Sequence, residues 1–332
     1  MTTATLSVAE HIDKFRERFV KISEEVGRRI VGHEEIVKGT VTAMLAGGHV
    51  LLEGIPGVGK TSLVHTLADA MHLKFSRIQF TPDLMPADIV GTNIVQENTH
   101  GGTFFEFQPG PIFANVVLAD EINRATPKTQ SALLEAMQEM TVSVGKTTYK
   151  LDQPFLVLAT QNPLEMEGTY PLPEAQLDRF FFKLKVKYPP EASMHLILDR
   201  TTQLADNTVN RVVDGIEILE MRRVARAVPI AKPVQTYAIH LTLGTHPDSP
   251  YATPLIKKYV RYGASPRAAQ TLVLAAKIHA ITRGQAFVSV EDIRAVALPT
   301  LRHRILLNFE GEADETSTDT LVAELLTGVK TE

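Results

Sequence analysis

The order of apolar and polar residues divides the chain into a first part where strands and helices alternate and a second part made of helices. Between positions 49 and 186, five short segments have the length of core strands, and helical spacing lies between them. The expected core strands are 50–53, 75–79, 115–119, 155–160 and 181–186. Such alternation is typical of a mostly parallel sheet with helices on both faces.

Two segments within this first part have the character of β-hairpins. The first spans 92–107 and turns at Gly101-Gly102; the second spans 141–151 and turns at Gly145-Lys146. Glycine at these positions suits the tight turn of a hairpin. Most of the aromatic residues at 104–107 are expected to pack within the first hairpin, with contact to a substrate as the alternative.

Helical spacing dominates the remainder of the chain. Two helices are expected before the first strand, at 8–28 and 34–46, and a run of helices after Tyr188-Pro189-Pro190. The latter are expected at 191–205, 217–228, 233–243, 252–262, 266–283 and 318–328. The acidic stretch 310–315 is expected to be a solvated loop. Arg302, His303 and Arg304 are expected on a solvated helix face, with an anion site as the alternative.

Composition narrows the classes of function. The 332 residues are 44% hydrophobic and 22% charged, as in ordinary globular proteins. The net charge of −4 disfavours a nucleic-acid partner. The absence of cysteine excludes disulfides, thiolate metal sites and cysteine nucleophiles. Apolar runs of strand length predict no membrane span, and the N-terminus does not read as a signal peptide. A cytoplasmic location is the simplest expectation.

The octet GIPGVGKT at 54–61 fits the phosphate-binding loop pattern, and it lies between an expected strand and an expected helix. In this context the backbone N–H groups of the loop face the phosphates. Lys60 would reach the β- and γ-phosphates, and the Thr61 hydroxyl would ligate Mg²⁺. The residues expected to bind the nucleotide in this loop are Gly54, Pro56, Gly57, Val58, Gly59, Lys60, Thr61 and Ser62.

Two further strands end in residues suited to nucleotide hydrolysis. The run VVLADE ends in Asp120 and Glu121, which we expect to hold Mg²⁺ and to polarise the attacking water, respectively. The run LATQNP contains Asn162, whose amide can bind both that water and the γ-phosphate. Taken alone, the acids could form a helix N-cap and Asn162 could be an ordinary turn residue.

Three arginines are candidates for contact with phosphate or with another subunit. Arg179 follows an expected helix, so it suits an arginine finger that acts on a neighbouring subunit, or a cation at a helix C-terminus. Arg267 lies in the first turn of an expected helix, where it opposes the helix dipole, and this favours a contact with phosphate. Arg124 fits an interface role or a local pair equally well.

The motifs GIPGVGKT, VVLADE, LATQNP, LDRF and GASPRA, in this order, resemble those of the AAA+ ATPases, and specifically of the MoxR family in the helix-2-insert clade. The resemblance covers about residues 27–310. It implies that 54–61 is the Walker A motif and 116–121 the Walker B motif. It also implies that Asn162 is sensor 1, Arg179 the arginine finger and Arg267 sensor 2, and that Val31 and Gly32 contact adenine.

The implied fold is α/β: a P-loop AAA+ core with a parallel β-sheet flanked by helices, followed by a smaller all-α lid. We place the N-terminal helix and nucleotide-binding core at 1–190, a connecting helix and linker at 191–215, and the helical lid at 216–332. In this clade the connecting helix repositions the lid. Whether Arg267 serves its own nucleotide or the neighbour's is therefore open at the level of sequence.

The resemblance further implies Mg²⁺-dependent hydrolysis of ATP to ADP by a ring, most simply a hexamer. It implies chaperone-like remodelling of protein complexes during maturation or insertion of a cofactor or metal, and a partner with a von Willebrand factor A domain. The alternatives are a DNA-associated motor, which the few cations of the hairpins disfavour, and a nucleotide-switched scaffold without turnover, which Glu121 disfavours.

Overall fold

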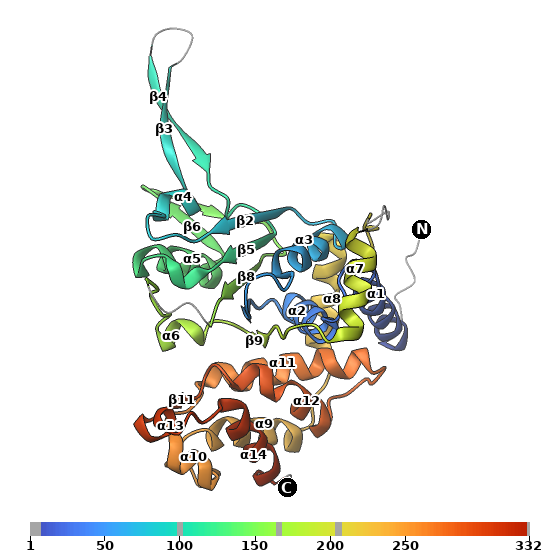
Figure 1. Ribbon diagram of the computed structural model, residues 1–332. Coiled ribbons are helices and arrows are strands. Elements are labelled where there is room, and N and C mark those ends of the chain that lie inside the picture. Colours follow the sequence, from blue (N-terminus) through green and yellow to red (C-terminus); the bar gives the residue numbers. More distant parts are fainter. Residues whose placement is uncertain (1–7, 98–101, 164–167, 203–207, 331–332) are drawn as a thin grey trace.

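The computed structural model describes residues 8–97, 102–163, 168–202 and 208–330. A five-stranded parallel sheet lies at the centre of the upper part in Figure 1, with strand order β2-β5-β8-β1-β9. Its strands are β1 Val50–Glu53, β2 Phe75–Gln79, β5 Val116–Asp120, β8 Leu156–Gln161 and β9 Phe182–Lys185. The parallel sheet and its helical cover confirm the expected fold class, and each strand lies within one residue of its predicted bounds.

Successive residues of the central strands point into two separate cores because side chains alternate along a strand. In β5, Val116 and Leu118 belong to a core shared with the N-terminal helices, whereas Val117 and Ala119 pack on the other face. Helices therefore cover both faces, which explains why β1, β5 and β8 are apolar up to their last residues. The helices of the core are α1 Val8–Arg29, α2 Glu34–Ala46, α3 Lys60–Ala70, α4 Pro86–Val90, α5 Pro127–Glu139 and α6 Glu174–Leu177, with a 3₁₀ turn at Ile122–Arg124.

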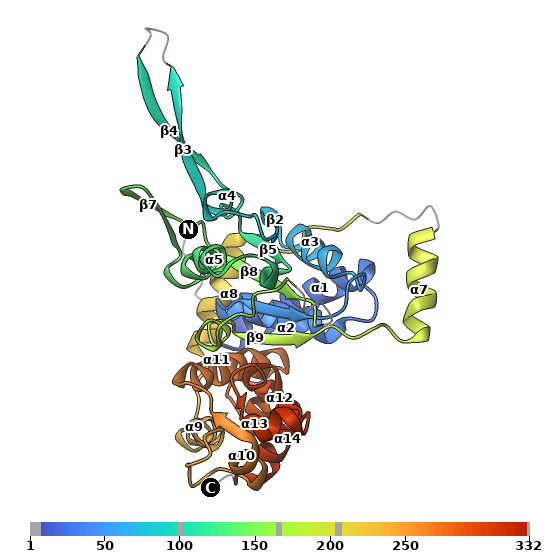
Figure 2. The same cartoon turned by 60° about the vertical axis from the view of Figure 1, so that its left-hand side comes forward.

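Both predicted hairpins are present. The strands β3 Gly91–Glu97 and β4 Thr103–Pro109 pair along their whole length and extend away from the body (Figures 1 and 2). The predicted turn includes Gly101, which lies outside the described residues. The second hairpin consists of β6 Thr141–Val144 and β7 Thr147–Lys150. The expectation for the aromatics holds in part: Phe107 stacks on Tyr149, but Phe105 is 76% exposed.

The helix α7 Glu191–Thr202 stands away from the rest of the molecule in Figure 2 and contributes no buried residue within its described length. Positions 203–205 of the predicted helix lie outside the described residues. Below the sheet in Figure 1 lies a helical lid. Its helices are α9 Lys232–Gly244, α10 Pro254–Tyr259, α11 Pro266–Thr282, α12 Val290–Leu301, α13 Phe309–Ala313 and α14 Thr318–Gly328. The helix α8 Gly215–Ala227, which the sequence assigns to the lid, packs against α1 and α2 beside the sheet.

The lid differs from the sequence expectation in three places. The helix predicted at 252–262 ends at Tyr259 because the next residues, β10 Val260–Tyr262, pair with β11 Leu306–Leu307. The acidic stretch predicted as a loop lies largely in α13, which the Asn308 side chain caps by accepting a hydrogen bond from Gly311 N. The helix α12 was not expected; it begins with a capping box formed by Ser289 and Asp292.

The prediction of a solvated helix face for Arg302, His303 and Arg304 is wrong. The ring nitrogen Nε2 of His303 lies 3.0 Å from the carbonyl oxygen of Phe180, and Arg304 donates to the same oxygen at 2.7 Å. Arg302 donates to the carbonyl oxygen of Lys183 in β9. These three residues therefore hold the backbone of β9 and of the residues just before it.

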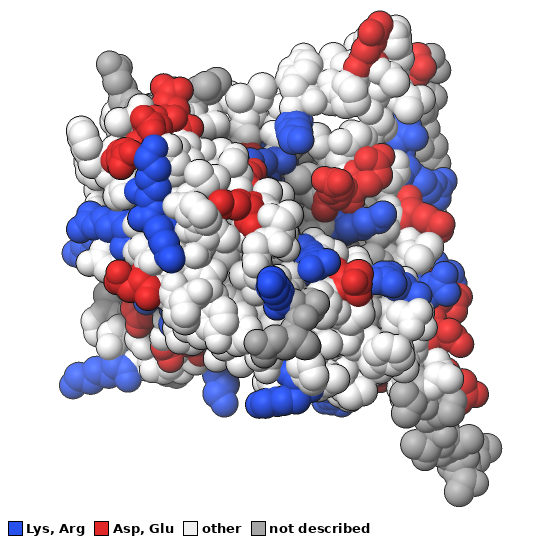
Figure 3. Space-filling model, turned by 90° about the horizontal axis from the view of Figure 1, so that it is seen from below, with Lys and Arg blue, Asp and Glu red and all other residues white. Residues whose placement is uncertain are grey.

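Seen from below, the lid face carries basic and acidic side chains interspersed with one another, in keeping with the small net charge (Figure 3). None of the helices in the described ranges is long and apolar enough to cross a membrane.

Candidate active site

The phosphate-loop motif connects the end of β1 to the start of α3. Gly57 and Gly59 have φ angles of 79° and 81°, a left-handed conformation that suits glycine. Gly54 has another reason to be glycine, since a Cβ there would lie 2.8 Å from the carbonyl oxygen of Val186. Lys60 bends back and donates to the carbonyl oxygen of Gly54 at 2.6 Å. The loop thus has the backbone of an anion-binding turn at a helix N-terminus.

The segment between α1 and α2 lies against this loop. His33, at the start of α2, places Nε2 at 3.0 Å from the carbonyl oxygen of Val58. Gly32 has a φ of 76°, and a Cβ there would lie 3.0 Å from the hydroxyl of Ser193 in α7. Gly32 therefore lies beside α7, next to a residue that contacts the phosphate loop, and the contact of Val31 and Gly32 with adenine stays a prediction.

The two acids at the end of β5 are held by different partners. Asp120 is nearly buried, and its carboxylate accepts hydrogen bonds from Thr160 Oγ1 at 2.7 Å and from Arg77 at 2.7 Å. Glu121 has a φ of 56° and a ψ of 51°, which costs a residue with a Cβ about 1–3 kcal/mol. Its backbone N–H donates to the same Thr160 hydroxyl at 2.8 Å. Thr160 therefore joins the Asp120 carboxylate to the strained peptide of Glu121.

The side chain of Glu121 lies in a polar environment. Its Oε2 atom accepts from Gln79 Nε2 at 2.8 Å and from Arg124 NH1 at 2.9 Å. Of the two roles left open for Arg124, the structure thus shows a local pair. Sequence reasoning missed Gln79, Arg77 and Thr160, although all three are polar residues within the predicted core strands.

Asn162 follows β8 and is 6% exposed. Since Gln161 is paired with Glu53, and the N–H of Gly54 donates to the carbonyl oxygen of Gln161, Asn162 lies beside the start of the phosphate loop. The structure therefore brings the loop, Asp120, Glu121 and Asn162 together at the carboxyl ends of β1, β5 and β8. Ligands of open parallel sheets bind at this edge.

The chemistry of this edge fits a nucleotide with Mg²⁺. The N-terminus of α3 and the glycine backbone can receive phosphate oxygens. The Asp120 carboxylate and the Thr61 hydroxyl supply oxygen ligands, which Mg²⁺ prefers together with water and phosphate oxygens. These residues would hold the ion.

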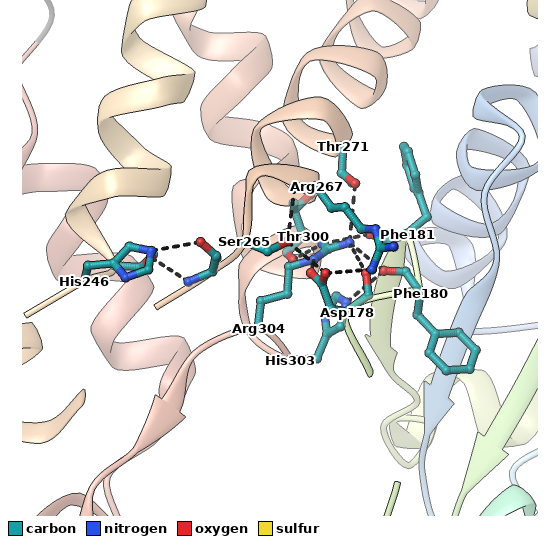
Figure 4. Close-up of polar contacts among 12 residues, drawn as sticks. Asp178, Phe180, Phe181, His246, Ser265, Arg267, Thr271, Thr300, His303 and Arg304 are labelled. Atoms are coloured by element: carbon teal, nitrogen blue, oxygen red, sulfur yellow. Dashed lines mark hydrogen bonds and ion pairs between the residues drawn. The ribbon is translucent and has the colours of Figure 1, made fainter. Parts of the chain in front are cut away.

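Arg179 and Arg267 lie at the opposite end of the sheet, where the parallel strands β1 and β9 begin. Phe181, two residues after Arg179, donates through its backbone N–H to His49, the residue before β1. From His49 to Gly54 the chain runs along β1, which at 3.3 Å per residue corresponds to about 16 Å. Arg179 donates to the carbonyl oxygen of Leu134 at 2.8 Å. Arg267 lies 3.2 Å from the Asp178 carboxylate (Figure 4). Neither arginine meets the phosphate loop of its own chain.

Comparison with known proteins places the two parts of the chain in known families. Residues 49–182 match the family described as "ATPase family associated with various cellular activities (AAA)", and residues 253–325 match the AAA lid domain. A crystal structure of a Cytophaga hutchinsonii protein superposes with a TM-score of 0.90 at 44% identity and covers 97% of each chain.

Curated relatives match over most of the chain. Chaperone MoxR1 of Mycobacterium tuberculosis is 42% identical over 91% of this chain and 79% of its own length. The uncharacterized protein YeaC of Bacillus subtilis is 41% identical over 93% of both chains. Protein MoxR of Methylorubrum extorquens is 29% identical over 88% of this chain and 89% of its own length.

Proposed function

Because this chain belongs to the MoxR family of AAA+ ATPases, we propose that it hydrolyses Mg²⁺-ATP at subunit interfaces of a ring and thereby remodels a protein client. Its activity as an ATPase follows from the family and from the match to the AAA ATPase domain. The assignment of individual steps to residues is our proposal, and so are the ring, its hexameric state and the client.

We assign one half of the site to the loop, Asp120, Glu121 and Asn162. Lys60 would turn from the Gly54 carbonyl toward the β- and γ-phosphates. Bound Mg²⁺ would neutralise charge on the phosphate oxygens. Glu121 would accept a proton from the attacking water, and Asn162 would orient that water. The nearly buried Asp120, fixed by Thr160 and Arg77, would keep its carboxylate in place for the ion.

The other half comes, in this proposal, from the neighbouring subunit. The observation that carries it is the placement of Arg179 and Arg267 at the amino ends of the strands, whereas the phosphate loop lies at their carboxyl ends. Both cations serve phosphate only if a second copy presents its amino end to the nucleotide. An arginine supplied across an interface stabilises the charge that develops on the transferred phosphoryl group.

The remodelling role rests on different support. The relative from Mycobacterium tuberculosis is named a chaperone, and here the hairpin β3–β4 presents exposed Phe104 and Phe105 well away from the core. We propose that the hairpins transmit motion to a protein complex during maturation or insertion of a cofactor or metal. A partner with a von Willebrand factor A domain and a cytoplasmic location belong to the same proposal.

A DNA motor is disfavoured by the charge of the hairpins. The described strands of the first hairpin carry Glu97 and Glu106 but neither lysine nor arginine, and the second carries Lys146 and Lys150. Single-stranded DNA that stimulated phosphate release in a salt-dependent manner would reverse this order.

The test of the proposed function has two arms. Phosphate release should fall by a factor of about 10²–10⁴ in Glu121→Gln, because the general base is lost; a wild-type rate no higher than that of this variant would exclude the assigned chemistry and leave a nucleotide-switched scaffold. In the second arm, Lys60→Ala and Arg179→Ala should each be nearly inactive alone. Mixing them should restore activity at interfaces that combine an intact loop with an intact arginine.

A further inference from the structure

The carboxylate of Asp178 lies at the junction between core and lid, directly after α6 (Figure 4). Three lid groups donate to it: Ser265 Oγ at 2.8 Å, Arg304 Nε at 3.0 Å and Arg267 NH1 at 3.2 Å. The side chain of Asp178 is only 15% exposed. A nearly buried carboxylate with three donors is held in a defined position.

The two arginines around Asp178 differ in freedom. The Arg304 side chain is 2% exposed and also donates to the carbonyl oxygens of Phe180 and Phe181. Burial lowers the pKa of Arg304 to about 10, Asp178 opposes this shift, and Arg267 adds a repulsion. The Arg267 side chain is 49% exposed. Arg304 is therefore the fixed partner of Asp178, and Arg267 is the partner that can turn toward solvent or phosphate.

Asp178 also fixes the start of α11. The Ser265 hydroxyl donates to Asp178 while it accepts the backbone N–H of Arg267, as an N-cap does. A carboxylate at a helix N-terminus is favourable, and it offsets the unfavourable position of Arg267 in the first turn. One side chain thereby ties the core to the lid. Asp178 is next to Arg179 in the sequence of the core, and it binds Arg267 of the lid across the junction.

We propose that Asp178 is a positioning residue that sets Arg179 of the core and Arg267 of the lid side by side, so that both face the nucleotide of the neighbouring subunit. This inference rests on the proposed function, since it requires that the two arginines act across an interface. Asp178 itself touches no phosphate; it acts through the placement of the two cations.

The experiment uses Asp178→Asn in the full chain. This change keeps the shape of the side chain but removes the charge that holds Arg267. We expect kcat for ATP hydrolysis to fall about tenfold to a hundredfold, as for small misplacements of catalytic groups. The KM for ATP should stay within about twofold, because the phosphate loop lies at the other end of the sheet.

Mixing experiments separate this role from a general structural defect. Mixed with Lys60→Ala, the Asp178→Asn variant should recover activity, because each supplies the half that the other lacks. Mixed with Arg179→Ala it should not, because both variants damage the same half. Asp319→Asn is the matched control: it removes the charge that pairs with Lys185 and Arg302 at the same lid–core junction, and kcat should stay close to wild type.

Wild-type kcat in Asp178→Asn would overturn the proposal. So would a loss of activity that Lys60→Ala does not restore while the pair of Arg179→Ala and Lys60→Ala does recover. If that second pair also fails to recover, the proposed function itself falls, and the inference with it. Should Asp178→Asn not fold, Asp178→Glu takes its place: it keeps the charge but shifts it by one methylene, so the same pattern is expected, and wild-type kcat would count against the proposal.

Discussion

At the scale of single residues, the strained backbone of Glu121 shows how the site is assembled. A glutamate in the left-handed region gives up about 1–3 kcal/mol. The hydrogen bond from its N–H to Thr160 Oγ1 helps to offset this, and the same hydroxyl donates to Asp120. One threonine therefore fixes both acids, and its hydroxyl is more important than its methyl group.

Removing that hydroxyl should damage the site more than removing the methyl group. In Thr160→Val, Asp120 loses a donor and Glu121 N–H loses its acceptor in a buried place, so we expect a loss of about 1–3 kcal/mol in stability and a lower kcat. Thr160→Ser keeps the hydroxyl and should retain most of the activity. Phosphate release and thermal unfolding measure both effects; equal activity of the two variants would contradict this role.

A second residue-scale prediction concerns pH. His49 is buried, with Nδ1 accepting from Val157 N and Nε2 at 3.0 Å from the carbonyl oxygen of Met137. Burial lowers its pKa from 6.5 to about 4. Above pH 6.5 the ring is neutral in both folded and unfolded states. Below it the unfolded state takes up a proton first, so stability falls with pH down to about 4.

Over this window His49 accounts for a loss of about 3 kcal/mol. The buried His303, whose pKa is also lowered by burial, adds a loss of the same sign. Chemical unfolding between pH 7.5 and 4.5 should show a shallower pH dependence in His49→Gln, which does not titrate. Identical slopes for this variant and the wild type would refute the assignment.

The sequence predicts the residues of the site that stand in motifs, but not those that reach it through the sheet. Asp120, Glu121 and Asn162 each lie at or just after the end of an apolar run, so the sequence alone identifies them. Gln79 reaches Glu121 only because β2 lies beside β5, an order that periodicity does not reveal. Arg304 binds Asp178, which lies 126 positions earlier in the sequence. The short basic run around Arg304 does not indicate this contact.

At the scale of elements, the predictions were best where one periodicity dominates. The strands β1, β5 and β8 are apolar up to their last residues, so their bounds followed directly. The stretch 260–262 continues the pattern of α10, yet it forms β10 because it pairs with β11. This partner lies more than forty residues later, so the local pattern does not reveal it. The acidic α13 depends on its cap at Asn308. In both cases a tertiary or capping contact outweighs the local pattern.

The two hairpins are joined by aromatic rings. Phe107 in β4 stacks on Tyr149 in β7 with ring centroids 4.0 Å apart, and Phe113 contacts both edge-on. Tyr149→Ala should loosen the base of the long hairpin by about 0.5–1.5 kcal/mol, seen as hydrogen exchange about two- to tenfold faster in β3 and β4. Phe105→Ala, at an exposed position of the same hairpin, is the control. Equal exchange in both variants would show that the stack does not link the hairpins.

At the scale of the whole molecule, the lid and the core meet through a mixture of buried and half-exposed polar groups. Arg304 and His303 bind the backbone at the entrance to β9, whereas Arg267 lies at the rim. We therefore expect the buried Arg304 to contribute most to the stability of the lid–core junction, and the half-exposed Arg267 to contribute most to kcat. Two arginines on the same carboxylate thus serve as a matched pair.

This division can be measured. Arg304→Met removes the buried cation paired with Asp178 and the hydrogen bonds that Arg304 donates to the carbonyl oxygens of Phe180 and Phe181, so we expect the lid–core junction to lose about 3–5 kcal/mol. Arg267→Met removes a half-exposed partner of the same carboxylate and should cost about 1 kcal/mol or less, while lowering kcat more strongly. The chain has no tryptophan, so urea unfolding is followed by circular dichroism. If the urea concentration at the midpoint of unfolding shifts equally in the two variants, Arg304 contributes no more to the lid–core junction than Arg267 does. Other contacts would then hold the lid to the core.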